Sequence, residues 1–274
     1  MFHSCTNLSS FERDLSNLTI GEMMFYYCPK LTSFSSDLSS LTNGNDMFHS
    51  CGNLISFTSD LSSLTDGSYM FDICTKLSSF TSDLSSLTIG EAMFQQCKNL
   101  TSFSIDLSSL TDGRYMFAGC TNLSSFTSDL SSLNMGINMF HNCKLNAASV
   151  KNIADTINTY NGGRITIHVD DTLSETDKNT ILSHFTTISN KGWTVDSNLS
   201  TVATVNEDGE IVESTMVCAK VDEPYDDYYT HLDNNGNKVI LRTAKMVIGP
   251  RENEWTVFAS LEDAEQHFGL TRVD

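Results

Sequence analysis

Basic side chains are scarce in this chain of 274 residues. It carries 16 Lys and Arg against 34 Asp and Glu, which gives a formal net charge of −18. Proteins bind nucleic-acid backbones and anionic membrane surfaces through clusters of cations. We therefore expect neither of these partners, and the surplus of carboxylates instead favours the solubility of a long molecule.

The sequence also lacks the signals of membrane insertion, secretion and catalysis. No apolar run approaches the ~20 residues that span a bilayer, and no basic segment or apolar stretch precedes Met1. Gly-x-Ser-x-Gly, P-loop and His-Glu-x-x-His motifs are all missing. These absences predict a protein without membrane insertion, without catalytic activity and without a cofactor.

A strict repeat fills the first half of the chain. Met and Phe recur as a pair at a constant step, without a slip. The pairs begin at Met1, Met24, Met47, Met70, Met93, Met116 and Met139. A fixed period of 23 residues predicts a stacked solenoid, because one unit cannot bury its apolar face alone. Since Met1 already opens a unit, either the native protein starts in mid-repeat or this chain is a segment of a longer one.

Other phases of the repeat predict the inside of each coil. Leu54, Phe57, Leu61 and Leu64 have apolar equivalents in nearly every unit. The Ser-Phe segment predicts a short strand, and neighbouring strands would be parallel and about 4.8 Å apart, which gives a sheet of roughly 30 Å. A glycine recurs at the phase of Gly67 and predicts a bend with positive φ.

Seven cysteines keep the same step as the Met-Phe pairs. They are Cys5, Cys28, Cys51, Cys74, Cys97, Cys120 and Cys143. Side chains at one phase of a solenoid point the same way, and their number is odd. We therefore expect buried thiols that act as small hydrophobes, with a metal or disulfide ladder as the alternative.

An aspartate recurs in the repeat as well. It stands at Asp14, Asp37, Asp60, Asp83, Asp106 and Asp129, just before each Leu-Ser-Ser-Leu segment. This position predicts a cap, in which the carboxylate accepts backbone amides of the following turn. A calcium ladder is the alternative, although no Asp-x-Asp-x-Asp-Gly loop accompanies the series.

The repeat resembles that of the BspA-like leucine-rich repeat surface proteins. Cys51-Gly-Asn-Leu54-Ile-Ser-Phe57, followed by Gly67-Ser-Tyr-Met70-Phe71, is similar to that family's Cys-x-x-Leu-x-x-apolar and Gly-x-x-Ala/Met-Phe. The likeness covers roughly residues 1–145. Where the family often has Ile-Pro-x-x-Val-x-x-Ile, this chain has Ser-Asp-Leu-Ser-Ser-Leu. The resemblance implies adhesion and host interaction at the surface of host-associated bacteria, and similar arrays occur on proteins of their phages.

After Lys144 the register breaks, and residues 146–196 predict a helix–strand–helix–strand unit. Asn146 has the place of an N-cap before a first helix that ends near Gly163. Residues 164–169 alternate like a strand, Ser174-x-x-Asp177 forms a capping box for a second helix, and residues 193–195 predict a closing strand. Such a unit would cap the open end of the solenoid.

The remaining residues predict a linker at 197–206 and a small module at 207–274. Strands are expected at 210–221, 238–248 and 255–258, with a helix capped by Ser260 and ended by Gly269. The predicted fold is therefore α/β: a leucine-rich-repeat-type parallel solenoid of 23-residue repeats over residues 1–145, an α/β C-terminal cap over 146–196, and a small α+β module.

Exposed phases that vary between repeats are the candidates for recognition, because invariant phases are structural. Such phases flank each Met-Phe pair, and the Tyr and His side chains among them suit contacts with sugars or proteins. The candidate binding residues are His3, Tyr26, Tyr27, His49, Tyr69, Gln95, Tyr115 and His141. The three histidines share one phase, but other coils lie between them, so no metal site is expected.

Two alternatives compete with this recognition surface. Genetic drift on a solvated edge would produce the same variation. A rival surface is the hydroxyl ladder, which consists of Ser33, Ser56, Ser79, Ser102 and Ser125 with Thr58, Thr81 and Thr127. This ladder is also the expected solvated outer side of the sheet.

The functional hypothesis is a non-catalytic binding or adhesion protein, at the cell surface or outside the cell, that presents its repeats to a host protein or glycan. The alternative is a structural virion component, a phage tail or head appendage, with the solenoid as spacer or receptor-binding element. Phe2, Leu8, Phe11 and Leu15 have no preceding coil to cover them. We therefore also expect an upstream cap, a homo-oligomer or a larger assembly at this edge, with the C-terminal module as a second attachment point.

Overall fold

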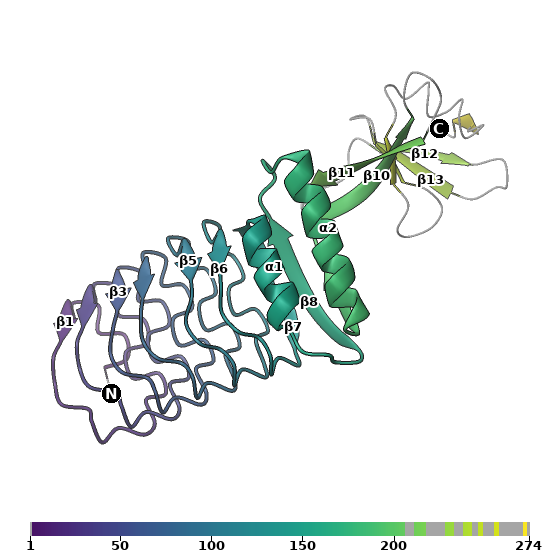
Figure 1. The fold of residues 1–274 in the computed structure, drawn as a ribbon. Helices are drawn as coiled ribbons and strands as arrows, with labels where there is room; N and C mark the ends of the chain where they lie inside the picture. The colour runs from purple at the N-terminus through teal and green to yellow at the C-terminus, as the bar shows by residue number, and fades with distance from the viewer. Residues whose placement is uncertain are drawn as a thin grey trace. The chain divides into compact units, whose positions relative to one another are not determined.

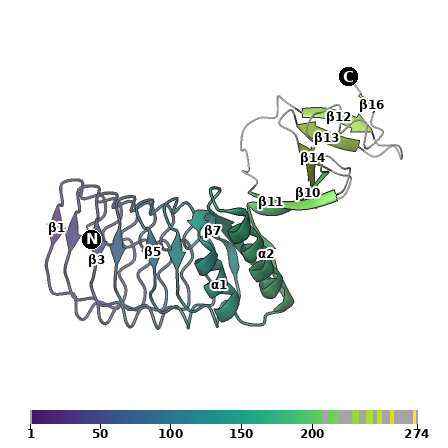
Figure 2. The same cartoon turned by 45° about the horizontal axis from the view of Figure 1, so that its top comes forward.

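This computed structural model describes residues 2–205 and, beyond them, 211–217, 228–232, 238–242, 246–248, 255–257 and 271–272 (Figure 1). The chain forms two compact units, Met1–Asn198 and Leu199–Asp274. The first unit is a stack of coils that ends in two helices and a small parallel sheet (Figures 1 and 2). No helix among these residues is long and apolar enough to cross a bilayer.

Each of the first six coils contributes a two-residue Ser-Phe strand. The strands are β1 (Ser10–Phe11), β2 (Ser33–Phe34), β3 (Ser56–Phe57), β4 (Ser79–Phe80), β5 (Ser102–Phe103) and β6 (Ser125–Phe126). They pair in parallel as β1 with β2, β3 with β4, and β5 with β6, and each residue lies opposite its equivalent in the next repeat. The parallel solenoid is thus confirmed, but the single continuous sheet was wrong, since the described strands form three separate pairs.

The continuous ladder of hydrogen bonds runs instead past the Met-Phe pairs. In this segment alternate amides donate to carbonyls of the next coil, over 2.8–2.9 Å. In one coil these are the amides of Gly67, Tyr69, Phe71 and Ile73. Equivalent bonds join the other neighbouring coils. Every second residue of this segment is therefore tied to the following coil, which fixes the distance and register between coils.

The core consists of the apolar phases expected from the repeat. In the interior coils the Met, Phe, Cys and Leu side chains are buried. Phe48 stacks on Phe71 with centroids 5.5 Å apart, and Phe57 meets Phe48 edge to face at 5.3 Å. Such ring pairs add about 0.5–1.5 kcal/mol beyond burial. In the first coil Phe2, Leu8 and Leu15 are only half-buried, whereas their equivalents in later coils are buried. Phe11, which was expected to be uncovered as well, is buried.

The repeat cysteines are free thiols that also donate hydrogen bonds. Cys28, Cys51, Cys74, Cys97, Cys120 and Cys143 are buried, and each Sγ donates to a Phe carbonyl of the preceding coil, over 3.1–3.3 Å. Cys51, for example, donates to Phe25 O. The expectation of free, buried thiols is confirmed for these six, with hydrogen bonds that the sequence did not reveal. Cys5 is free and half-buried.

The recurring glycines serve close packing and not positive φ, so that expectation was wrong. Gly67 has no positive φ, and a Cβ built on it would lie 2.9 Å from Met93 Sδ and 3.3 Å from Leu64 Cδ2. Gly44 meets Met70 Sδ in the same way, at 2.8 Å. The first five glycines of the series make room for the methionine of the next coil, and Gly136 makes room for Ile165 of the following strand.

A helical unit covers the last coil, as predicted, but its first helix ends at Thr156 and not near Gly163. Strand β7 (Gly136–Leu145) leads into α1 (Ala147–Thr156), β8 (Gly163–Val169), α2 (Glu175–Asn190) and β9 (Trp193–Asp196). Strands β7, β8 and β9 form a parallel sheet. The expected caps are confirmed: Asn146 Oδ1 accepts from Ser149 N, and Ser174 Oγ from Asp177 N.

Helix α1 occupies the position of a seventh Ser-Phe strand. Ser149 Oγ accepts a hydrogen bond from Phe126 N at 2.9 Å and donates one to Ser124 O at 3.0 Å. The Phe126 amide would otherwise be left unpaired at the end of the stack, whereas Ser124 O also accepts from Asn146 N at 3.0 Å. The ammonium of Lys191 then closes α1, because it donates to the Ala154 and Ile157 carbonyls at 2.7 and 2.8 Å. The boundary at residue 145 stays a prediction, since solenoid and cap lie in one compact unit.

The second unit contains a seven-stranded sheet in the order β11-β10-β15-β14-β13-β12-β16. Its strands are β10 (Leu199–Val205), β11 (Ile211–Val217), β12 (Tyr228–Leu232), β13 (Lys238–Arg242), β14 (Met246–Ile248), β15 (Trp255–Val257) and β16 (Thr271–Arg272). The prediction of a linker at 197–206 was wrong, because strand β10 occupies most of these residues. The prediction of a single strand at 238–248 was also wrong, because these residues form two antiparallel strands, β13 and β14. The helix after Ser260 lies outside the described residues.

The glycine packing yields a first prediction. Gly67→Ala should lower the free energy of unfolding by about 1–3 kcal/mol, since its Cβ must displace Met93 in a filled core. Gly52→Ala is the matched control, because its Cβ would meet Thr75 Oγ1 at an ordinary 3.6 Å. Urea denaturation of both variants measures the difference. Equal midpoints would contradict the packing role.

The thiols yield a second prediction. Burial raises the pKa of Cys51 to about 12 and the pKa values of Cys74, Cys97 and Cys143 well above the usual range. The thiolate is the reactive form, so these cysteines should resist iodoacetamide at pH 8 in the folded protein. Among the repeat cysteines, mass spectrometry should find only Cys5 modified before denaturation and all seven afterwards. Rapid native labelling of Cys74 would contradict this.

Candidate binding face

The eight candidate residues come together on one side of the coils. We call this side the variable face and define it by residues 3–4, 20–27, 43–50, 66–73, 89–96, 112–119 and 135–142. Tight turns within each coil and the hydrogen-bond ladder between coils hold it in place: Asp72 N bonds to Tyr69 O, and Ser50 N to Asp72 O. Side chains at equivalent phases therefore form columns that run along the stack.

The backbone of the variable face is left-handed at many side-chain-bearing positions. In the described part of the chain all 12 non-glycine residues with positive φ lie on it. They are Ser4, Met23, Tyr27, Asp46, Ser50, Tyr69, Ile73, Ala92, Gln96, Tyr115, Asn138 and Asn142. A left-handed conformation costs a residue other than glycine roughly 1–2 kcal/mol, and it is unusual for tyrosine or isoleucine.

Three candidate aromatic residues form a stack. The His3 and Tyr26 rings lie 4.9 Å apart at 5°, and the Tyr26 and His49 rings 4.6 Å apart at 2°. Tyr26 thus separates the two histidines, as expected from the intervening coil. His141 lies at the far end of the same column, where its ring meets His168 of β8 at 4.7 Å. Tyr27 projects beside the stack with half of its surface exposed.

The column continues from His49 into a pair of carboxylates. His49 Nδ1 lies 3.4 Å from Asp46 Oδ1 and 3.3 Å from Asp72 Oδ2. Burial raises the pKa of Asp72 to about 7; the Ile73 amide opposes the rise and the charge of Asp46 adds to it. Burial also raises the pKa of Asp46 and lowers that of His49. The three groups lie within ion-pair distance of one another through His49, so the protonation of each one affects the other two.

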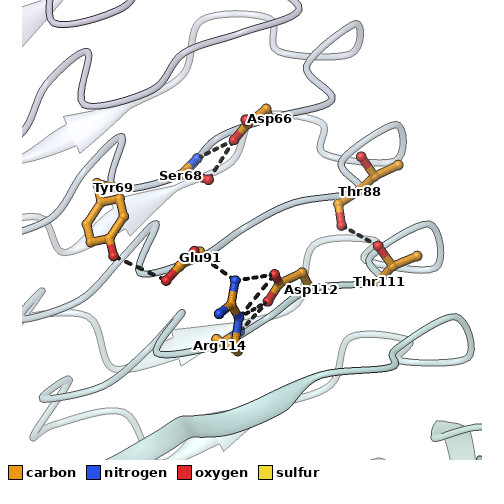
Figure 3. Close-up of polar contacts among 8 residues, drawn as sticks. All are labelled: Asp66, Ser68, Tyr69, Thr88, Glu91, Thr111, Asp112 and Arg114. Atoms are coloured by element: carbon orange, nitrogen blue, oxygen red, sulfur yellow. Dashed lines mark hydrogen bonds and ion pairs between the residues drawn. The ribbon is translucent and has the colours of Figure 1, made fainter.

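The next coils carry a charged network (Figure 3). Arg114 donates to both carboxylate oxygens of Asp112 at 2.8–3.1 Å and to Glu91 Oε2 at 3.0 Å. The Tyr69 hydroxyl donates to Glu91 Oε1 at 3.2 Å. Hydrogen bonds to Asp112 are the main cause of the raised pKa of Arg114. Three coils are thus tied together through their side chains.

The variable face also gathers exposed apolar side chains. Of the ten large hydrophobic residues that are exposed in the described part of the chain, eight belong to it. They are Ile20, Met23, Tyr27, Ile73, Ile89, Tyr115, Met135 and Ile137. The other two, Ile55 and Tyr160, lie elsewhere. A concentration of this kind marks an interaction surface more often than isolated exposed residues do.

The aspartate series flanking the Ser-Phe strands has a local structural role. Each carboxylate accepts a hydrogen bond from the amide two residues later, over 2.7–2.9 Å, as Asp60 does from Ser62. This is the cap expected from the sequence. Among the described residues no group of three or more His, Cys, Asp or Glu side chains could hold a metal ion.

The repeats of this chain match a known family of repeat proteins. A family model for a BspA type leucine rich repeat region, in 6 copies, matches residues 1–66 and 42–161. The chain belongs to this family. Its resemblance to BspA-like repeats is therefore confirmed, together with the solenoid. Searches of curated proteins and of solved structures found no match.

Membership in this leucine-rich repeat family indicates a protein-binding role in general. The sequence had singled out eight residues by their variation, and the structure places all of them on the variable face. It did not point to Asp46, Asp72 or Arg114 as parts of charged clusters. A signal existed for Arg114, because it is the one cation among the equivalent phases of the repeat.

The carboxylate cluster yields a third prediction. A raised carboxyl pKa means that the folded state favours the proton, so this contribution to stability is full below about pH 4 and is lost as pH rises towards 7. Asp72→Asn cannot ionise and should escape this loss. Between pH 4 and 8 the variant should gain roughly 2–4 kcal/mol relative to the wild type, since one pKa unit corresponds to about 1.4 kcal/mol.

Urea denaturation at several pH values measures this gain. Asp60→Asn is the control for a change of charge, because it lies exposed at a turn that asparagine also caps. A pH profile of Asp72→Asn that runs parallel to the wild type would show that Asp72 titrates like an exposed aspartate.

Proposed function

We propose that this chain is a non-catalytic binding module that holds a host or cell-surface protein or glycan on its variable face. Leucine-rich repeat families are in general non-catalytic. By analogy with BspA-like proteins we place the module at the cell surface or outside the cell. Adhesion is the role that this placement favours.

One observation carries the proposal. Tyr27, Tyr69, Ile73 and Tyr115 occupy left-handed positions at which glycine would cost less. These large side chains are at least partly exposed, so packing in the core does not explain their presence. Backbone strain that is kept at exposed positions points to a function of the side chains.

The Ser-Phe side of the solenoid differs from the variable face. Its exposed positions are mostly Ser and Thr, and its surface is nearly uniform from coil to coil. A uniform, regular side also suits a spacer, which is the supporting observation for the alternative of a structural virion component. In that alternative the solenoid separates other parts of a tail or head appendage.

The first coil supports a further contact. Phe2, Leu8 and Leu15 are half-buried, whereas the equivalent Phe25, Leu31 and Leu38 are fully buried. An upstream coil or cap, a second subunit or another part of a larger assembly would each cover this apolar edge. Homo-oligomerisation is one of the contacts that we propose.

The fourth prediction tests binding by the variable face. The whole protein is applied to a glycan array and to an array of host cell-surface proteins. The double variant Tyr27→Gly/Tyr115→Gly should lose at least about tenfold in affinity for the ligands found, because the exposed rings are removed. Its stability should stay equal or rise, since glycine relieves the left-handed backbone.

The control is the double variant Ile55→Ser/Tyr160→Ser. It removes two exposed apolar side chains that lie outside the variable face. Its binding should equal that of the wild type. Equal losses in both double variants, or no ligand above background on either array, would contradict the proposed function.

A further inference from the structure

The variable face is strongly acidic. It carries six carboxylates against one cation, Arg114. The carboxylates are Glu22, Asp46, Asp66, Asp72, Glu91 and Asp112. Asp112 and Glu91 already bind the guanidinium of Arg114, so its charge is neutralised within the protein (Figure 3). The carboxylates nearer the N-terminus are left without any Lys or Arg partner among the described salt bridges.

Asp72 is the most unusual of these carboxylates. Its relative exposure is 4%, and Oδ1 has no hydrogen-bond partner. Among the described residues, the basic side chain within ion-pair distance of it is His49, whose pKa burial lowers, so that the imidazole is mainly neutral at pH 7. A buried carboxylate without a cation is costly, and a cation that docks beside it reduces this cost.

Exposed apolar side chains surround this acidic segment. Ile20, Met23 and Tyr27 lie on its N-terminal side, and Ile73 and Ile89 on its C-terminal side. Exposed apolar side chains therefore flank the acidic groups on both sides along residues 20–96 of the variable face. A complementary ligand combines cationic groups with apolar ones.

We propose that the part of the variable face between residues 20 and 96 binds a polypeptide segment that carries both basic and apolar side chains. The inference rests on the proposed binding function and specifies the partner. Lysine or arginine side chains of the segment pair with Asp46 and Asp66, and a cation beside Asp46 lowers the cost of ionising the buried Asp72, which shares His49 with it. Its apolar side chains cover Met23, Tyr27 and Ile73.

The geometry favours a polypeptide over a sugar. Sugars commonly dock on the free flat face of an aromatic ring, but both faces of Tyr26 are covered by His3 and His49. The exposed aliphatic side chains of Ile20, Ile73 and Ile89 offer contacts that a hydroxyl-rich sugar ring matches poorly. Aliphatic and basic side chains of a protein match both the apolar and the acidic groups.

The fifth prediction uses three labelled 12-residue peptides and fluorescence anisotropy with the whole protein. One peptide repeats Lys-Leu-Ser, the second Lys-Ser-Ser and the third Glu-Leu-Ser. The first should bind at least about tenfold more tightly than the other two, since it alone satisfies both kinds of contact. The affinity of the Lys-Leu-Ser peptide should fall in 0.5 M salt, because salt screens ion pairs near the protein surface.

Two double variants separate a specific site from the general attraction of an acidic protein. Asp46→Asn/Asp72→Asn should weaken binding of the Lys-Leu-Ser peptide at least about tenfold. Asp37→Asn/Asp60→Asn removes the same charge from exposed turns near the Ser-Phe strands, where asparagine still caps the turn, and should change binding less than about twofold. Circular dichroism verifies that both variants are folded.

Each outcome decides the inference. Equal weakening by both double variants, or equal binding of the Lys-Leu-Ser and Lys-Ser-Ser peptides, would show charge attraction alone and overturn it. Loss of affinity confined to Asp46→Asn/Asp72→Asn supports it. If none of the peptides binds while the arrays yield a glycan or an acidic protein that requires Tyr27 and Tyr115, the specified partner is wrong and the binding function stands.

Discussion

The register between coils is the constraint on which the structure depends. Each coil must place its amides opposite carbonyls of the next coil, while its Phe and Leu side chains stack on their equivalents one repeat later. A coil of another length would break both sets of contacts. The backbone ladder and the aromatic stack therefore enforce the same period, and each explains why the other never slips.

The same register explains which parts of the fold could be predicted from the sequence. Stacking turns one repeated pattern into a solenoid, so the buried Leu, Phe, Met and Cys phases followed directly. The N-cap residues Asn146 and Ser174 predicted α1 and α2, because capping signals are local. The role of the glycines did not follow, because it depends on how Met93 fills the space above Gly67. Such contacts exist only once two coils are in place.

For the candidate site, variation between repeats was the informative signal. It identified His3, Tyr26 and His49, which the structure then joins into one stack. It could not show that His49 stands between two carboxylates, since Asp46 and Asp72 are in different phases of the repeat. Left-handed backbone was equally hidden, because glycine, its usual sequence signal, occurs at only one of these positions, Gly119.

The way α1 ends the stack bears on how such a protein changes its length. Ser149 satisfies the last strand as a further coil would, so the cap requires only the surface that every coil presents. A whole repeat unit could thus be gained or lost by recombination within the array without redesign of the terminus. Each such event would shift the reach of the molecule by about 5 Å. It would also add or remove one row of the variable face, so that reach and binding surface are altered together by a single genetic step.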